Sequence, residues 1–251
     1  MKYTVITACL NGARYLERTL HSVLTQDYGN YEIIVQDGGS TDTTPLILER
    51  YARRINARSE PDSGIYDAWN RGLERANGDW VIFLGADDFL IGGDVFSRCA
   101  PILGSLPPHV DSAYGALARG VDGRPKLRIR SSLTSIYSGF FQGWGLPFAA
   151  TFTRISTLRR YGFDPSFTIA GDFDFTARTL APGNIARIPH FVSFMETGGV
   201  SDSDAHDERL LEERSRILRD HIIPKAPLIA ESCLAYLDES RTAEDLRTNR
   251  E

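Results

Sequence analysis

The chain has 251 residues, of which 42% are hydrophobic and 24% are charged, so it can bury a full core and has an average globular composition. Its net charge of -5 excludes a global basic field, and we expect no nucleic-acid partner. The cysteines lack the paired spacing of a zinc site or disulfide framework. No segment approaches the ~18 consecutive apolar residues of a membrane-spanning helix, and the N-terminus lacks a secretory signal, which predicts a cytoplasmic protein.

The first part of the chain predicts alternating strands and helices. Apolar runs, turn residues and helical spacing indicate strands over 3–8, 32–36, 56–60 and 80–84, with helices over 15–26, 40–53 and 66–76. The second part predicts strands over 110–119 and 126–130 around a turn at Asp122-Gly123, an aromatic glycine-rich stretch over 139–153, and helices over 155–161, 172–180 and 208–222. Beyond Pro224 we expect one more helix and a frayed end. Repeated strand–helix units predict a parallel sheet that binds its ligand at the carboxyl ends of strands.

Acidic residues occupy three of the predicted strand ends, at 37–39, 60–62 and 87–88. The first turn, ACLNGARY, lacks the glycine spacing of a dinucleotide site, and no Walker-type lysine loop is present. A diphosphate can meet carboxylates only if a divalent cation lies between them. The sequence therefore predicts a divalent metal.

A run of motifs carries a family resemblance. TVITACLNGARYLERTLHSVLTQDY, QDGGSTDTT and EPDSGIYDAWNRGLERANGDWVIFLGADD are followed by FFQGWGLPFAATF, FTIAGDFDFTAR and GGVS. In this order, over roughly residues 1–201, they resemble the inverting glycosyltransferases of family 2, which make bacterial polysaccharides and glycolipids. The resemblance implies the α/β GT-A fold, with a Rossmann-like, mostly parallel sheet flanked by helices, a smaller acceptor-side region and a helical C-terminus.

The resemblance also implies the reaction. One sugar would pass from a UDP-, GDP- or dTDP-type nucleotide-sugar to a saccharide or lipid-linked acceptor. Residues 1–105 would form the nucleotide-sugar-binding half, 106–205 the acceptor and catalytic-base half of the same domain, and 206–251 a helical tail. A mixed arginine and aromatic region over 128–144 is a candidate for peripheral contact with the inner face of the plasma membrane.

Five residues are candidates for donor binding. Asp37 can accept an N–H from a base edge, or it can cap the helix that follows. Asp62 can meet the nucleotide or serve a plain Asx turn. Tyr66, Asp67 and Asn70 can share one helix face and contact the donor ribose or phosphate, although Asp67 also suits a helix start.

The metal motif departs from the family pattern. Its usual form is aspartate, any residue, aspartate, but here the first of these positions is Gly85. The resemblance then makes Asp87 the ligand of Mg²⁺ or Mn²⁺, in contact with the donor diphosphate, and Asp88 a direct or indirect ligand. The alternative is that both are turn aspartates.

On the acceptor side, Asp172 matches the family's catalytic base, with helix capping, or Asp174 as the base, as the alternatives. Gln142 and Trp144 can form an acceptor platform or pack in the core. The loop over 198–201 resembles one that orders over the donor. Arg214 belongs to an alternating-charge helix, which predicts a solvated face.

Two other functions remain open. A sugar-nucleotide nucleotidyltransferase or pyrophosphorylase also uses an α/β domain and Mg²⁺, but it normally has a glycine-rich basic N-terminal loop, and this chain has only Arg14 there. A catalytically silent carbohydrate-binding relative is compatible with Gly85, whereas Asp87, Asp88 and Asp172 argue against it.

Overall fold

Four parallel strands form the N-terminal part of a nine-stranded sheet. The computed structural model describes residues 1–129, 132–181, 183–198 and 207–233. The strands are β1 (Tyr3–Cys9), β2 (Tyr31–Asp37), β3 (Asn56–Ser59) and β4 (Trp80–Phe83), arranged β3-β2-β1-β4. These strands were predicted within one or two residues, because buried strands with turn residues at their ends give a clear local signal.

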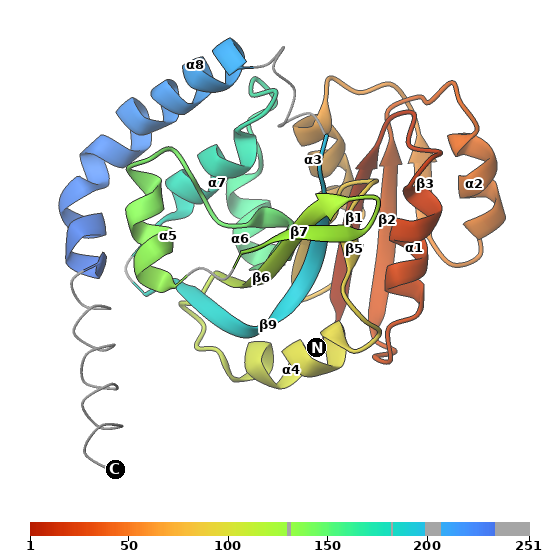
Figure 1. Cartoon of the computed structure of the whole chain (residues 1–251), viewed down its shortest axis with the longest axis horizontal. Coiled ribbons are helices and arrows are strands. Elements are labelled where there is room, and N and C mark those ends of the chain that lie inside the picture. The colour runs from red at the N-terminus through yellow and green to blue at the C-terminus, as the bar shows by residue number, and fades with distance from the viewer. Residues whose placement is uncertain (130–131, 182, 199–206, 234–251) are drawn as a thin grey trace.

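The alternation of apolar residues along these strands gives the sheet two buried faces. Val5 and Ile33 pack in the core with α1 (Leu16–Leu24) and α2 (Thr44–Tyr51). Ile6 and Ile34 pack in a second core with Trp69 of α3 (Ile65–Arg75). Figure 1 shows helices on both sides of the sheet. The crossovers thus bring the ends of β1, β2 and β4 to one edge.

The second part of the sheet is mixed. Its strands are β5 (Phe89–Leu90), β6 (Ser112–Val121), β7 (Arg124–Ile129), β8 (Thr151–Arg154) and β9 (Ile185–Glu196). Beyond β4 the order is β8-β6-β9-β5, and β7 pairs with β6. β8 is antiparallel to both of its neighbours, β4 and β6, whereas β9 runs parallel to β6. Asp122 and Gly123 both have positive φ angles, which confirms the predicted turn and matches a tight hairpin.

Several elements were not predicted. Pro101 and Gly104 obscure α4 (Val95–Ser105), which buries Val95, Phe96, Cys99 and Leu103. The aromatic glycine-rich stretch contains the end of α5 (Leu133–Phe140), a 3₁₀ turn η1 (Phe148–Ala150) and β8. β9 was missed because it contains Pro189. The register of β6 and β9 shifts beside that proline, between Tyr114 and Leu117, so the missing N–H falls at an irregularity.

The C-terminal part is helical. It comprises α6 (Ile155–Tyr161), α7 (Gly171–Thr179), α8 (Asp207–Ile217), a π-helical turn η4 (Leu218–Ile222) and a 3₁₀ turn η5 (Ile223–Lys225). The helix predicted over 208–222 is therefore α8 followed by η4. Most of the predicted donor-covering loop over 198–201, and the predicted frayed end, lie outside the described residues. Among the helices described, none combines the length and apolarity needed to cross a bilayer.

Gly72 allows α3 to approach β1, and this contact can be tested. A Cβ added at Gly72 would lie 2.7 Å from Cγ2 of Ile6, whereas one added at the exposed Gly104 of α4 would meet nothing within 4 Å. We expect Gly72→Ala to lower the free energy of unfolding by about 1–3 kcal/mol through overpacking. Gly104→Ala should raise it by about 0.5–1 kcal/mol through helix propensity. Urea denaturation measures both, and equal effects would contradict the close packing.

Candidate active site

Three loops meet where β1, β2 and β4 end. The Gly38 N–H donates to the Cys9 carbonyl over 2.8 Å, and the Leu84 N–H donates to the Ile6 carbonyl over 3.0 Å. A Cβ on Gly12 would lie 3.2 Å from the Cβ of Ala86. The loops that carry the predicted acidic residues are therefore neighbours at one edge of the sheet.

Asp37 is fully buried, and its carboxylate accepts hydrogen bonds from neighbouring residues of the protein. It accepts hydrogen bonds from the Ser40 hydroxyl, the Ser40 N–H over 3.1 Å and the Ser59 hydroxyl over 2.5 Å. Asp62 lies close by, because a Cβ on Gly38 would come within 2.9 Å of its Oδ2. Burial raises the pKa of Asp62, and the Gly64 N–H, donating over 3.0 Å, opposes that rise. The structure brings these two candidates together.

The three candidates on α3 have different surroundings. The Asp67 carboxylate accepts from the Ser63 N–H over 2.9 Å and pairs with Arg71, so it stabilises the start of α3. Asn70 both donates to and accepts from the Phe163 backbone, at 2.8 and 3.0 Å. These bonds tie both side chains to the protein itself. Tyr66 is buried, and its hydroxyl contacts the segment around Asp172.

The loop after β4 holds two carboxylates beside Gly85. The Asp88 carboxylate is buried and accepts from the Gly85 N–H over 3.3 Å and the Glu196 N–H over 3.1 Å. Burial, and then the charge of Asp87, raise the pKa of Asp88 to about 7. A Cβ on Gly85 would lie 2.8 Å from Oδ1 of Asp87 and 3.0 Å from Oδ2 of Asp88. Gly85 therefore makes room for both carboxylates.

A divalent ion fits this loop only if the ligands are shared with substrate. Among the described residues, no group of three or more His, Cys, Asp or Glu side chains could hold a metal. Both oxygens of Asp88 already accept backbone N–H groups, whereas Asp87 is half-buried at the loop surface. Mg²⁺ is commonly held by one or two carboxylates together with substrate phosphates and water. The carboxylates of this loop therefore fit a metal ion that binds together with a diphosphate.

Asp172 lies in the first turn of α7, next to Tyr66. The Tyr66 hydroxyl donates to the Ile169 carbonyl over 2.6 Å and lies 3.5 Å from Oδ1 of Asp172. Burial raises the pKa of Asp172 to about 6, and the Phe173 N–H, the Tyr66 hydroxyl and the charge of Arg214 limit that rise. A carboxyl group in this range is ionised near neutral pH and can still accept a proton.

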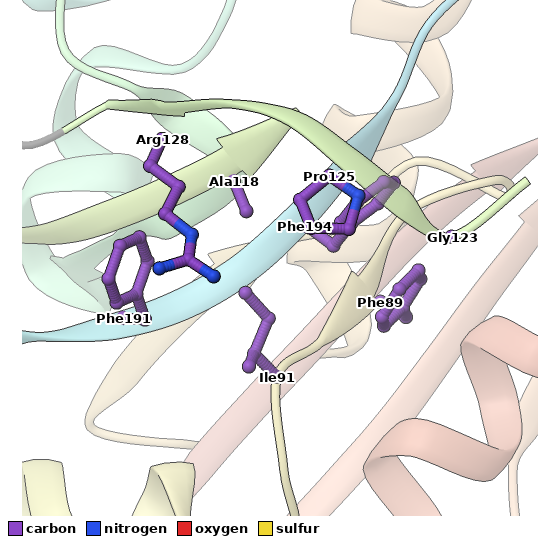
Figure 2. A pocket seen from close by; sticks show the side chains of 8 residues that line it. All are labelled: Phe89, Ile91, Ala118, Gly123, Pro125, Arg128, Phe191 and Phe194. Atoms are coloured by element: carbon purple, nitrogen blue, oxygen red, sulfur yellow. The ribbon is translucent and has the colours of Figure 1, made fainter. Parts of the chain in front are cut away.

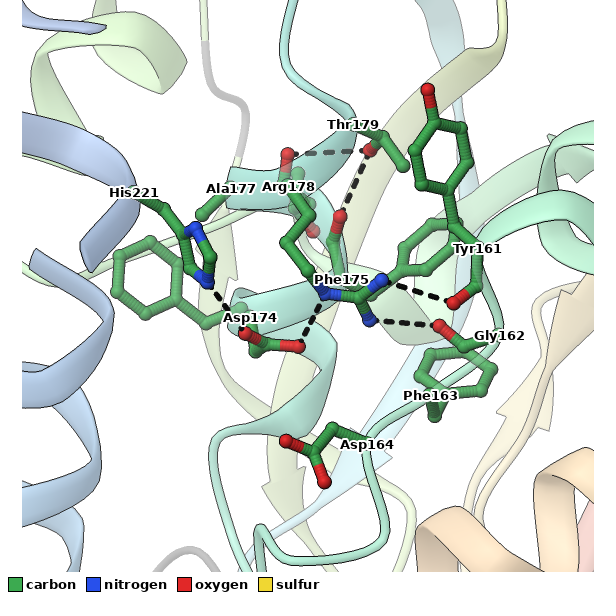
Figure 3. Close-up of polar contacts among 12 residues, drawn as sticks. Tyr161, Gly162, Phe163, Asp164, Asp174, Phe175, Ala177, Arg178, Thr179 and His221 are labelled. Atoms are coloured by element: carbon green, nitrogen blue, oxygen red, sulfur yellow. Dashed lines mark hydrogen bonds and ion pairs between the residues drawn. The ribbon is translucent and has the colours of Figure 1, made fainter. Parts of the chain in front are cut away.

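Asp174 forms ionic and hydrogen-bonding contacts with residues other than Asp172. Its carboxylate pairs with Arg178 over 2.7 Å and lies 3.3 Å from Nε2 of His221, and its side chain is 3% exposed. Arg178 in turn donates to the Tyr161 and Gly162 carbonyls (Figure 3). This geometry favours Asp172 over Asp174 as a residue that meets substrate.

Arg214 lies beside Trp144, although the charge pattern of its helix predicts a solvated face. Its guanidinium carbon lies 4.2 Å from the centre of the Trp144 ring, and its charge acts on Asp172. The Trp144 side chain is 58% exposed and Gln142 is also exposed, which excludes core packing for both. The adjacent Gly145 packs on α7, because its Cβ would lie 3.2 Å from the Phe173 ring. Trp144 is thus beside the start of α7, with Arg214 stacked on it.

The comparisons with known proteins agree with this geometry. The family model described as glycosyl transferase family 2 matches residues 4–152. The chain belongs to this family. A PGL/p-HBAD biosynthesis glycosyltransferase of Mycobacterium bovis is 31% identical over 222 residues, which cover 83% of this chain and 82% of that protein. An uncharacterised glycosyltransferase of Mycobacterium tuberculosis is 35% identical over 180 residues, covering 70% and 67%.

Two solved structures show the same fold as this glycosyltransferase. S. aureus TarS in complex with UDP-GlcNAc has a TM-score of 0.70 at 20% identity, covering 92% of this chain and 71% of that one. The mannosyltransferase PcManGT from Pyrobaculum calidifontis, in complex with GDP-Man and Mn²⁺, has a TM-score of 0.68 at 21% identity, covering 99% and 79%. The expected GT-A-type fold with a helical C-terminus is confirmed.

The glycosyltransferase also has an apolar hollow that sequence analysis missed. It has a volume of about 440 Å³ and lies between β5, β9 and the β6–β7 hairpin (Figure 2). It is lined by Phe89, Ile91, Ala118, Gly123, Pro125, Arg128, Phe191 and Phe194. Phe89 directly follows Asp88, so the hollow begins next to the candidate metal loop. Its lining comes from strands far apart in sequence, which explains why no linear motif revealed it.

The two roles considered for Asp37 can be separated by stability. Asp37→Ala would remove the acceptor of three hydrogen bonds from Ser40 and Ser59, each worth about 0.5–1.5 kcal/mol, so we expect the free energy of unfolding of this glycosyltransferase to fall by about 1–3 kcal/mol. Asp62→Ala removes the acceptor of only the Gly64 N–H and should cost about 1 kcal/mol or less. Urea denaturation measures both. Unchanged stability of Asp37→Ala would contradict its part in holding the loop.

Proposed function

We propose that this glycosyltransferase inverts the anomeric centre of a nucleotide-sugar, with Asp172 as the general base. The observation that carries the proposal is the environment of Asp172: a half-buried carboxyl group in the first turn of α7, with its pKa raised to about 6. Tyr66, which precedes two of the donor-binding candidates on α3, bonds to the segment before Asp172. The base is thereby linked to the donor half of the fold.

The proposed step is a single displacement. The acceptor hydroxyl oxygen forms a bond to the anomeric carbon as its proton passes to the Asp172 carboxylate. The bond from the anomeric carbon to the diphosphate oxygen breaks on the opposite face, and the nucleoside diphosphate leaves with that electron pair. Asp172 later returns its proton to solvent.

Asp87 is proposed to hold Mg²⁺ or Mn²⁺ together with the donor diphosphate. A bound divalent ion would supply Lewis-acid stabilisation of the charge on the leaving diphosphate. The bonds of Asp88 to Gly85 and Glu196 support a role in fixing the loop, with Asp87 as the direct ligand. The Mn²⁺ in the complex of PcManGT supports this proposal.

The donor is proposed to be a UDP-, GDP- or dTDP-sugar. TarS is described with UDP and UDP-GlcNAc and PcManGT with GDP-Man, so the fold accepts more than one base. Asp37 and Asp62 are the candidates for donor contacts, and Asp37 can act by shaping the loop that Ser40 begins. Thermal-shift screening of nucleoside diphosphates with Mn²⁺ would identify the base, because a ligand that binds the folded state raises its stability.

The acceptor is proposed to be a saccharide or a lipid-linked molecule that meets Gln142 and Trp144. Two features support the lipid-linked form. The apolar hollow beside the metal loop suits an apolar portion of the acceptor. Phe141 and Trp144 expose 45% and 58% of their surface in the region proposed for peripheral membrane contact.

A catalytically silent carbohydrate-binding relative is the second candidate, and Gly85 is the observation that favours it. Donor turnover decides between the two. Metal-dependent release of nucleoside diphosphate that is lost in Asp172→Asn supports the enzyme. Absence of turnover with every donor and acceptor tested would support the silent relative.

The stimulation of donor turnover by a divalent metal should require Asp87. We expect Asp87→Ala to reduce Mn²⁺-stimulated donor turnover by about 10²-fold or more, since Lewis-acid stabilisation contributes several kcal/mol and 1.36 kcal/mol corresponds to a factor of ten. The exposed Asp220 of η4 provides the matched control, and Asp220→Ala should keep the parent's rate. Release of nucleoside diphosphate, measured with and without chelator, reports the effect. Equal stimulation in both variants would contradict the assignment.

The pH dependence of kcat/KM should reflect the ionisation of Asp172. The base must be ionised, so kcat/KM should fall as pH drops through about 6 and reach a plateau above it. The charge of Arg214 lowers the pKa of Asp172, so Arg214→Gln should move this fall to higher pH. Arg219→Gln, at an exposed arginine paired with its neighbour Asp220, is the control and should leave the profile in place. A profile unaffected by Arg214→Gln would argue against the coupling.

A further inference from the structure

The segment that leads into α7 is held by one carboxylate from α8. The N–H groups of Thr168, Ile169 and Ala170 all donate to Glu213, over 2.7, 3.0 and 2.8 Å. Glu213 is buried, with 6% of its surface exposed, and its only partner among the described charged side chains is Arg209, at 3.2 Å. Three consecutive backbone donors thus converge on a residue more than forty positions away.

The three N–H groups stabilise the ionised form of the Glu213 carboxylate. Burial raises the pKa of Glu213, but the N–H groups of Ala170, Thr168 and Ile169 outweigh that effect and hold the pKa below its ordinary value. Successive backbone N–H groups that point to one place form an anion-binding concavity, and bonds from them to a carboxylate are strong. Glu213 therefore fixes the path of the backbone over 168–170.

α3 holds the other side of the same segment. The Tyr66 hydroxyl donates to the Ile169 carbonyl, and a Cβ on Gly171 would lie 2.7 Å from the Tyr66 ring. Glu213 thus binds residues 168–170 through their N–H groups, and Tyr66 holds Ile169 through its carbonyl and Gly171 through packing. The next residue is Asp172, whose position follows from this double attachment.

The same C-terminal stretch contacts α7 at two further points. His221 of η4 approaches Asp174 in the first half of α7 (Figure 3). Lys225 of η5 donates through Nζ to the carbonyls of Ala177, Arg178 and Leu180 at the end of α7, over 2.8 to 3.0 Å. A cation at a helix C-terminus is favourable, so this contact anchors the end of α7. Residues 207–225 therefore contact the segment before α7, the first half of α7 and its C-terminal end.

We propose that Glu213 is a positioning residue for the glycosyl transfer: it sets the backbone before α7 so that the Asp172 carboxylate reaches the acceptor hydroxyl. The inference rests on the proposed role of Asp172 as the base. It gives α8 a part in the reaction through the buried contact of Glu213 with the backbone, with no contact to substrate required. Misplacement of a catalytic group by about 1 Å can reduce the rate by about 10²-fold.

The test compares Glu213→Gln with Glu212→Gln, an exposed neighbour on the same helix. An amide offers one acceptor oxygen and turns an NH₂ group toward backbone donors, so the segment should shift. We expect Glu213→Gln to lower kcat by about 10- to 100-fold. The donor KM should stay unchanged, because the donor loops follow β1, β2 and β4. Glu212→Gln should keep the parent's kcat and KM.

A second variant covers the case in which Glu213→Gln does not fold. Glu213→Asp keeps the charge and withdraws it by one methylene, and we expect a folded protein with a smaller loss of kcat, about 3- to 10-fold. Thermal denaturation verifies folding in each case. A folded Glu213→Gln, or failing that a folded Glu213→Asp, with the parent's kcat would overturn the inference.

Asp172→Asn, measured alongside, separates this inference from the function it rests on. If Asp172→Asn is inactive and the folded Glu213 variants are fully active, only the positioning role fails. If Asp172→Asn keeps the parent's rate, the proposed base fails, whatever the Glu213 variants do.

Discussion

The architecture of this glycosyltransferase depends on how it satisfies buried carboxylates. An ionised carboxylate withdrawn from water is stable only if hydrogen-bond donors or cations replace its hydration. Asp37, Asp88, Glu196 and Glu213 are all buried, and each accepts hydrogen bonds from backbone N–H groups. Ser40, Gly85, Asp122 and Thr168, which donate some of these bonds, lie in loops and turns outside helices and strands. Acidic side chains thus help to order the loops around the candidate active site.

These carboxylates also divide the acidic residues into two kinds. Those with all their oxygens engaged by the protein, such as Asp88, shape the site. Those that are only half-buried, such as Asp87 and Asp172, are the ones proposed to meet a ligand. The distinction matters because the two kinds look alike in the sequence, where Asp87 and Asp88 are adjacent. Burial and bonding separate them: Asp88 is buried with backbone N–H groups on both oxygens, whereas Asp87 is half-buried.

The N-terminal part of the fold could be predicted because its signals are local. The apolar strands β1, β2 and β4 end at recognisable turn residues, and α3 shows a regular apolar face. Asp122-Gly123 specified a tight hairpin by conformational preference alone. Asp172 was placed at the start of a helix by the same kind of reasoning, and family resemblance supplied its chemical role.

The rest required three-dimensional contacts. The charges on α8 form a pattern typical of a solvated helix, yet Glu213 is buried against backbone and Arg214 stacks on Trp144. Nothing in the linear pattern distinguishes these two from their exposed neighbours. Asp67 and Asn70 show the same dependence from the other side, because both are candidates for donor contacts and both also bind the protein's own backbone. Propensity describes a residue by itself, whereas these roles depend on its distant partners.

Gly85 has a consequence for how this active site could change over time. A Cβ at that position would lie 2.8 Å from Oδ1 of Asp87 and 3.0 Å from Oδ2 of Asp88, so an aspartate there would require the ends of these two side chains to turn aside. A third acidic group would therefore come with new side-chain positions for the two carboxylates that follow it. The effect of a substitution at position 85 thus depends on which residues occupy positions 87 and 88, so these three positions are expected to evolve together.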